Sequence, residues 1–238
     1  MLAACVAICK DLSPGNAAFC DDPLHIHRAS TNAASCILGA CQDNALPQTF
    51  VDPRRTPEPV VWTDLVGTAA NGPDLSRTAA DTGAFDAGAA SVATQTITHG
   101  DGYVEFTATE TDKARICGLS SSTTPETAAT PADIQFGIRL TVGSKIIVTE
   151  AGTLVLGPDG TSNFGSYASG DRLRVIVTDN FDGTANIAYA LVPADCAAAG
   201  CEGTVFRTAG PAPYPFRVDA TFNQTGGTLT DVRIVRIQ

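Results

Sequence analysis

The residues with the clearest capacity for binding chemistry lie in one short polar segment. Asp179, Asp182 and Asn186 gather carboxylate and amide oxygens around an Asp-Gly turn, and Tyr189 follows shortly after them. Such oxygens can bind sugar hydroxyls or calcium, but their spacing does not match the EF-hand loop. We therefore predict that these four residues form a ligand-binding site. Calcium is a weaker alternative, no other cofactor is expected, and a plain hairpin turn would explain the same composition.

Paired carboxylates for glycoside chemistry are harder to find. Glycosidases place two acids on either side of the scissile bond, about 5–5.5 Å apart in retaining enzymes. Glu105 and Glu110 are the only near pair, and their odd separation puts them on opposite faces of a regular strand. Glu150 shares a strand face with apolar residues, so it needs a hydroxyl or guanidinium partner unless the strand ends there in solvent. We expect the solvent-exposed strand end, because Ala151-Gly152 follows directly.

Nucleophilic and metal chemistry find little support in the sequence. No Gly-x-Ser-x-Gly elbow is present, and His99 has no evident Ser or Cys partner. His25 and His27 lie among cysteines near the N-terminus, where a zinc site is one interpretation. We favour disulfides for these cysteines, since their spacing is loose for zinc, and we predict no metal site.

Eight cysteines indicate an oxidising, extracytoplasmic location. Cys196 and Cys201 are close enough in sequence to close a short loop, so we predict that they pair. The predicted disulfide cysteines of the N-terminal region are Cys9, Cys20, Cys36 and Cys41.

Two further cysteines decide the connectivity. Cys117 occupies an apolar strand position, and we predict a buried free thiol there. Cys5 ends a Leu-Ala-Ala-Cys tetrapeptide that resembles a bacterial lipobox, so a lipid anchor at Cys5 is one alternative. If Cys5 is a disulfide partner instead, one N-terminal cysteine must reach Cys117.

The larger pattern is a series of short segments in which apolar and polar residues alternate. A period of two is typical of strands with one buried and one wet face, as in antiparallel sheets packed face to face. The two cleanest segments are 133–140 and 216–222, and turn residues such as Asn71-Gly72 and Gly226-Gly227 separate segments like these along the chain. The sequence therefore predicts an all-β antiparallel sandwich of the jelly-roll type.

The chain divides into three predicted parts. Residues 1–50 form a Cys-rich cap without strand periodicity, which would need disulfides to hold a shape. Residues 51–59 contain three prolines and predict an extended linker. Residues 60–238 carry the alternating pattern and form the predicted sandwich.

Composition excludes several partners. The formal net charge is −10 with no basic cluster, which argues against nucleic acid and against an anionic membrane surface. No apolar run approaches the roughly 18 residues of a transmembrane helix. With one Trp and four Tyr, the chain lacks the aromatic platform that binds crystalline polysaccharide, although a small glycan pocket remains compatible.

Several motifs from residue 60 onward resemble a bacterial secreted or cell-surface jelly-roll module similar to concanavalin A-like and SPRY-type domains. The motifs are 62–67, 100–106, 118–120, 133–136, 170–175 and 214–219. The resemblance implies a concanavalin A-like sandwich and says little about the ligand. The segment 190–195, leading into the Cys196–Cys201 loop, departs from the hairpin usual in such modules.

Three functions are compatible with these observations. We expect a non-catalytic extracellular or cell-surface module that binds glycan or another surface component. The first alternative is a structural subunit of an extracellular filament or assembly, joined through the N-terminal cap. A glycan hydrolase or lyase is the third, disfavoured by the lack of paired acids.

Overall fold

The computed structural model describes residues 56–121, 130–157, 159–196 and 203–237, all of which belong to the unit Pro53–Gln238. These residues form two antiparallel sheets and no helix. Sheet 1 contains β1 (Glu58–Pro59), β3 (Thr68–Asn71), β4 (Asp74–Arg77), β7 (Asp101–Thr107), β12 (Arg172–Asp179), β13 (Thr184–Val192), β14 (Thr204–Pro213) and β16 (Thr228–Ile237). Sheet 2 contains β2 (Trp62–Val66), β5 (Ala87–Ser91), β6 (Thr96–Ile97), β8 (Arg115–Ser120), β9 (Phe136–Leu140), β10 (Ile146–Glu150), β11 (Thr153–Leu154) and β15 (Phe216–Phe222).

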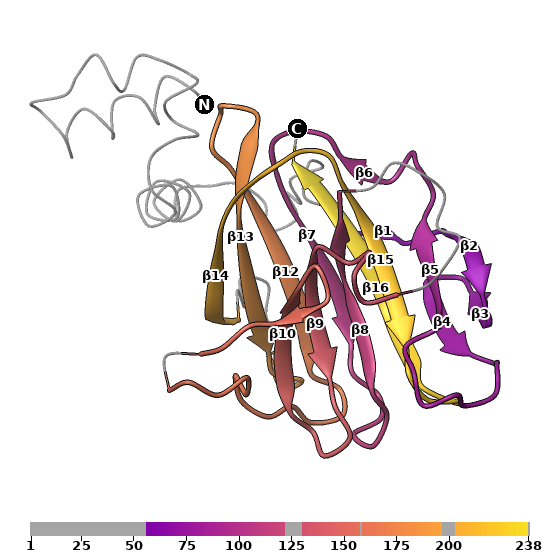
Figure 1. The fold of residues 1–238 in the computed structure, drawn as a ribbon. Helices are drawn as coiled ribbons and strands as arrows, with labels where there is room; N and C mark the ends of the chain where they lie inside the picture. The colour runs from indigo at the N-terminus through magenta and orange to yellow at the C-terminus, as the bar shows by residue number, and fades with distance from the viewer. Residues whose placement is uncertain (1–55, 122–129, 158, 197–202, 238) are drawn as a thin grey trace, which may run out of the picture. The chain divides into compact units, whose positions relative to one another are not determined.

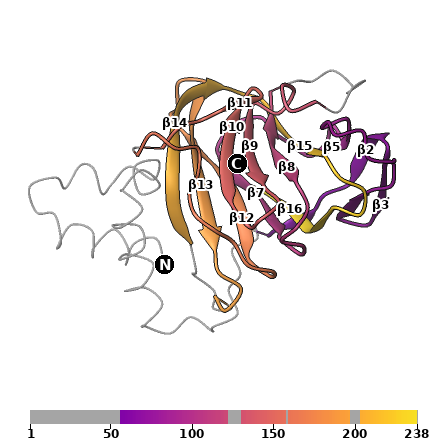
Figure 2. The same ribbon diagram turned by 60° about the horizontal axis from the view of Figure 1, so that its bottom comes forward.

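The strand order confirms the predicted antiparallel sandwich (Figure 1). Sheet 1 runs β14-β13-β12-β7-β16-β4-β3, and sheet 2 runs β11-β10-β9-β8-β15-β5-β2. The edge strand β14 of sheet 1 and the β10–β11 edge of sheet 2 lie on the same side of the sandwich (Figure 2). That side holds the candidate site described below.

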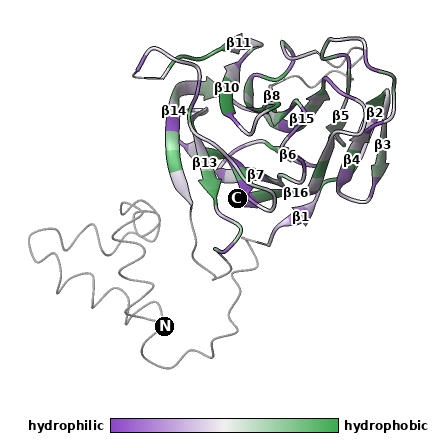
Figure 3. Cartoon of the chain, turned by 90° about the horizontal axis from the view of Figure 1, so that it is seen from below, coloured by the Kyte–Doolittle hydropathy of each residue, from purple (hydrophilic) through white to green (hydrophobic). Residues whose placement is uncertain are grey.

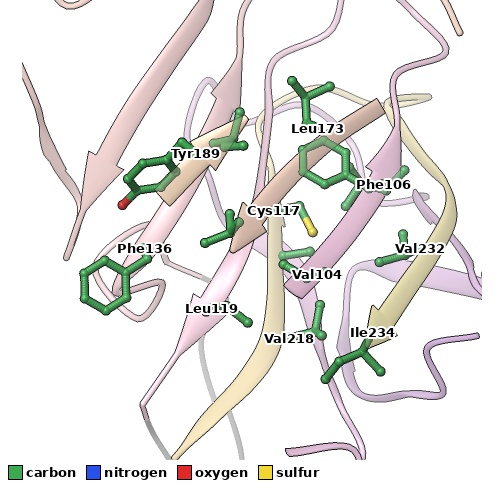
Figure 4. Close-up of a cluster of buried hydrophobic side chains, with 14 of the residues drawn as sticks. Val104, Phe106, Cys117, Leu119, Phe136, Leu173, Tyr189, Val218, Val232 and Ile234 are labelled. Carbon is green, nitrogen blue, oxygen red and sulfur yellow. The ribbon is translucent and has the colours of Figure 1, made fainter. Parts of the chain in front are cut away.

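The core follows directly from the alternation in the sequence. Polar and apolar residues succeed one another along single strands, as the banded colouring of β14 shows (Figure 3). Apolar side chains from sheet 1, including Val104 and Leu173, meet those of sheet 2, including Leu119 and Val218, in one buried cluster (Figure 4). The face of each sheet turned away from this cluster is called its outer face below.

Strand boundaries depart from the sequence pattern at several places. β5 was not predicted, because Ala87–Ser91 is made of small residues, all of them buried, and shows no alternation. β9 begins at Phe136 rather than at Asp133, where the predicted segment 133–140 starts. The predicted cap at 1–50 lies outside the described residues, whereas the last residues of the predicted linker form β1 and pair with β16.

Two glycines bring β8 and β9 close together. Gly118 and Gly137 lie directly opposite each other. A Cβ atom added to Gly118 would collide with the carbonyl oxygen of Phe136, and one added to Gly137 would lie 2.8 Å from Thr149 Oγ1. Glycine is therefore required at both positions for this approach of the two strands.

Candidate functional site

The predicted loop residues lie at the β12–β13 hairpin, where they organise the turn. Asp179 Oδ1 accepts a hydrogen bond from the Phe181 backbone N–H at 2.9 Å, and Asp182 Oδ1 accepts from the backbone N–H of Thr184 at 2.9 Å. The hydroxyl of Thr184 also donates to Asp182, and this bond is the largest cause of the lowered pKa of that carboxyl group. Asn186 Nδ2 donates to Asn180 Oδ1 at 2.7 Å.

Tyr189 is separated from the other three predicted residues. It lies three positions after Asn186 on β13, so the two side chains leave opposite faces of the sheet. Asn186 is exposed, whereas Tyr189 is fully buried between the sheets. The four residues therefore do not converge on one ligand. The sequence analysis also overlooked Phe181, whose side chain is 63% exposed at the tip of the hairpin.

Tyr189 instead belongs to a polar cluster between the sheets, at the side where β14 and β10 form adjacent edges. Its hydroxyl points away from the apolar core (Figure 4). Glu150 at the end of β10 lies near this hydroxyl, and Arg207 Nη2 on β14 lies 3.9 Å from Glu150 Oε1. We call Glu150, Tyr189 and Arg207 the edge cluster.

Each member of the edge cluster has a buried polar atom without a hydrogen-bond partner. These atoms are the Tyr189 hydroxyl oxygen, Glu150 Oε1 and Arg207 Nε. Burial raises the pKa of Tyr189, and the nearby Glu150 carboxylate raises it further, so the phenol is protonated at neutral pH. The cluster thus combines a hydroxyl, a carboxylate acceptor and a guanidinium donor whose bonding capacity is unused.

Partly buried apolar side chains surround the edge cluster. Phe206 stacks on Tyr189 with ring centroids 6.4 Å apart, and Phe164 lies 5.9 Å from Phe206. Both phenylalanines pack against the core while remaining partly exposed, as Val155 does. About a third of the side-chain surface of Glu150 and Arg207 is exposed, so these two residues reach solvent, whereas Tyr189 lies fully buried behind them.

The acids of the near pair, Glu105 and Glu110, bind different arginines. Glu105 binds Arg174 Nε at 2.5 Å and lies 3.5 Å from Arg172 Nη1, all on the outer face of sheet 1. Glu110 lies beyond the end of β7, where it forms an ion pair of 3.2 Å with the fully buried Arg115. Each carboxylate is thus held in its own ion pair.

The cysteines within the described residues have clear states. Cys117 is a free thiol buried in the core, and burial raises its pKa. Cys196 is disulfide-bonded. Cys201 and the five N-terminal cysteines lie outside the described residues, so the predicted pairings remain predictions, as does the lipid anchor at Cys5.

The part of the chain that the structure describes offers no preformed metal site. No three or more His, Cys, Asp or Glu side chains within it group together as metal ligands, and calcium therefore stays an untested alternative. In the same residues, no helix has the length and apolarity to span a bilayer.

Comparisons with known proteins yield structural similarity only. No family model matches the sequence, and no curated protein does. A human SPRY domain is similar in structure, with a TM-score of 0.46, 14% sequence identity and coverage of 71% of this chain and 94% of that one. The exoplasmic/lumenal domain of VIP36 in its Ca2+/Man-bound form has a TM-score of 0.44 and 7% identity, covering 74% and 83%.

An endo-β-1,4-glucuronan lyase from the fungus Trichoderma reesei is also similar, with a TM-score of 0.36, 9% identity and coverage of 79% and 92%. These three similar structures thus include a lumenal domain in a Ca2+/Man-bound form and an enzyme. Similarity at this level is too low to transfer a ligand or an activity to this chain, so the function has to be argued from its own residues.

Proposed function

We propose that this protein is a non-catalytic, extracytoplasmic module that binds a glycan at the edge cluster. The observation that carries the proposal is the set of three unsatisfied polar atoms of Glu150, Tyr189 and Arg207 beside aromatic rings. Buried polar groups are normally hydrogen-bonded to protein or ordered water, so a group without a protein partner is open to a water molecule or a ligand. Three such atoms, beside two side chains that reach solvent, are a reason to expect a ligand there.

The chemistry of the edge cluster suits a sugar hydroxyl. One hydroxyl group can accept a hydrogen bond from Arg207 Nε while it donates to Glu150 Oε1, and a neighbouring hydroxyl can bond to Tyr189. The partly exposed rings of Phe164 and Phe206 offer apolar surface to the C–H face of the same sugar. A site with few directed polar groups beside aromatic surface is typical of small-molecule recognition.

The extracytoplasmic location rests on the cysteines. A disulfide-bonded Cys196 and eight cysteines in 238 residues are expected of a protein that matures in an oxidising compartment. Glycans are abundant in that environment.

Binding is tested with the full chain and one pair of matched variants. Tyr189→Phe removes the hydroxyl and keeps the ring, whereas Tyr214→Phe removes a hydroxyl that already donates to Gly100 O at 2.8 Å, outside the edge cluster. A glycan array with and without calcium first identifies a ligand, and titration calorimetry then gives its Kd. We expect Tyr189→Phe to weaken binding at least 10-fold and Tyr214→Phe to change the Kd less than 2-fold.

Two results would contradict the proposal. The first is an array without any bound glycan in either condition. The second is a Kd that is the same for the wild-type protein and Tyr189→Phe. The same incubations, assayed for new reducing ends and for unsaturated sugars, test the absence of catalysis; release of either product would replace the binding module by a hydrolase or lyase.

A second candidate, the structural subunit, is favoured by one observation. β14 is a ten-residue strand at the edge of sheet 1, paired with β13 alone among the described strands. Such an edge can accept a strand from another chain, although Pro211 and Pro213 block its C-terminal end. Sedimentation that finds only monomers at high concentration would argue against this candidate.

A further inference from the structure

A second unsatisfied group lies on the outer face of sheet 2, away from the edge cluster. Arg139 on β9 alternates with the core residues Ile138 and Leu140, so its side chain leaves the outer face. Its guanidinium carbon lies 4.8 Å from the centroid of the Phe85 ring. Among the described residues, no carboxylate forms an ion pair with Arg139, although the chain carries a net charge of −10.

The Arg139 side chain is partly buried, and no neighbouring carboxylate balances its positive charge. Its Nε atom is buried and has no hydrogen-bond partner. Desolvation lowers the pKa of the guanidinium, and no neighbouring acid opposes that effect. A partly desolvated cation without an anion is unfavourable, so the site has unused affinity for a negative charge.

A further unsatisfied polar atom lies on the same face as Arg139, on the neighbouring strand β10. Thr149 is opposite Gly137, and its hydroxyl oxygen lies 2.8 Å from where a Cβ of Gly137 would be, which places it on the same face as Arg139. This hydroxyl is buried and has no hydrogen-bond partner.

Phe85 is held in place by a buried arginine. Arg77 donates to the carbonyl oxygens of Ala80 at 2.6 Å and Ala84 at 3.4 Å, and its Nη1 lies 2.6 Å from Asp86 Oδ1. These bonds fix the loop on both sides of Phe85. Because the ring covers one face of the Arg139 guanidinium, a ligand is left to approach the edge, where the N–H groups point.

From this arrangement we infer that Arg139, Thr149 and Phe85 form a second binding site, for the carboxylate of an acidic sugar. The guanidinium edge matches a carboxylate, and its single positive charge suits one carboxylate better than a dianionic phosphate. The hydroxyl of Thr149 offers a hydrogen bond to a ring hydroxyl beside the carboxylate. Asp219, on the same face, lies on β15, two strands from β9, which separates the two backbones by about 10 Å.

The inference is independent of the edge cluster and is tested with defined oligosaccharides. Tetragalacturonate and neutral cellotetraose are titrated into the full chain and into Arg139→Gln and Arg233→Gln. The control variant also removes one positive charge, but from an arginine paired with Asp231 at 2.8 Å. We expect tetragalacturonate to bind the wild-type protein, Arg139→Gln to weaken it at least 10-fold, and Arg233→Gln to weaken it less than 3-fold.

Further variants separate charge from geometry. Arg139→Lys keeps the charge but loses the planar fork, so it should give a loss between those of the wild-type protein and Arg139→Gln. Tyr214→Phe, outside both sites, should leave tetragalacturonate binding unchanged. The inference is overturned if tetragalacturonate does not bind the wild-type protein, if Arg139→Gln and Arg233→Gln lose affinity equally, or if only Tyr189→Phe reduces binding. None of these results decides whether the edge cluster binds a neutral glycan.

Discussion

Removing the Tyr189 hydroxyl should make the unliganded protein more stable while it weakens ligand binding. The hydroxyl is buried without a hydrogen-bond partner, and such a group costs about 1–3 kcal/mol. Glu150 nearby is about one-third exposed, so we take the low end of that range. We therefore expect Tyr189→Phe to raise the free energy of unfolding by about 1 kcal/mol, which corresponds to a Tm increase of roughly 2–4 °C for a domain of this size.

The Tyr214 hydroxyl supplies the opposite case. It donates to Gly100 O at 2.8 Å, and a satisfied hydrogen bond of this kind stabilises the fold by about 1 kcal/mol. Tyr214→Phe should therefore lower the free energy of unfolding by about that amount. The two variants make the same chemical change, so the opposite signs would come from the difference in hydrogen bonding alone.

Urea denaturation followed by tryptophan fluorescence measures both effects. Trp62 is the single tryptophan and is buried in the sandwich, so its emission reports on unfolding of this unit. If Tyr189→Phe destabilises the protein as much as Tyr214→Phe does, the Tyr189 hydroxyl has a partner in the unliganded protein. The physical basis for a ligand at the edge cluster would then be removed.

Four further predictions concern residues outside the edge cluster. Arg139→Gln should leave Tm unchanged or slightly raised, because the charge of Arg139 is uncompensated. Arg77→Met should lower the free energy of unfolding by ~3 kcal/mol in a thermal melt, because Asp86 and several carbonyl oxygens lose their donor. Cys117 should resist a thiol reagent at pH 8 in the native protein and react only after denaturation, since burial raises its pKa; rapid native labelling would contradict this burial. The pKa of Asp86 is lowered, first by the hydrogen bond from Thr82 and then by that from Arg77. The stabilising contribution of this carboxylate is therefore present above about pH 3.8 and is lost as the pH falls through the folded-state pKa. Asp86→Asn should remove this acid dependence from urea midpoints measured between pH 2 and 5.

The fold class could be predicted from the sequence because apolar residues in the core strands recur with a period of two. Segments such as 216–222 carry an apolar residue at every second position, and that face packs in the core; the other face, predicted to be wet, is buried as well. The alternating pattern did not predict β5. Its Ala and Gly residues have low strand propensity and no alternation, and they form a strand because β15 and β2 pair with it on either side.

Only part of the candidate site could be predicted from the sequence. Tyr189 was identified, but with loop residues that its strand position places on the other face. Its actual neighbours come from β10 in the opposite sheet and from β14, and such proximity depends on how the sheets pack, which no local spacing records. One signal was present: Glu150 shares the core-facing parity of Ile146 and Val148, and a carboxylate there demands a partner. The parity of Glu150 therefore predicts a hydroxyl or guanidinium partner, in addition to the strand end that the following Ala151-Gly152 indicates.

The most direct test of the central claim is a map of backbone amide chemical shifts on addition of the neutral glycan selected by the array. The edge cluster predicts that the largest shifts fall at Glu150, Tyr189 and Arg207, on three strands from two sheets, and that they vanish in Tyr189→Phe. Shifts confined to the hairpin at 179–186, or spread evenly with no maximum at these three residues, would contradict it.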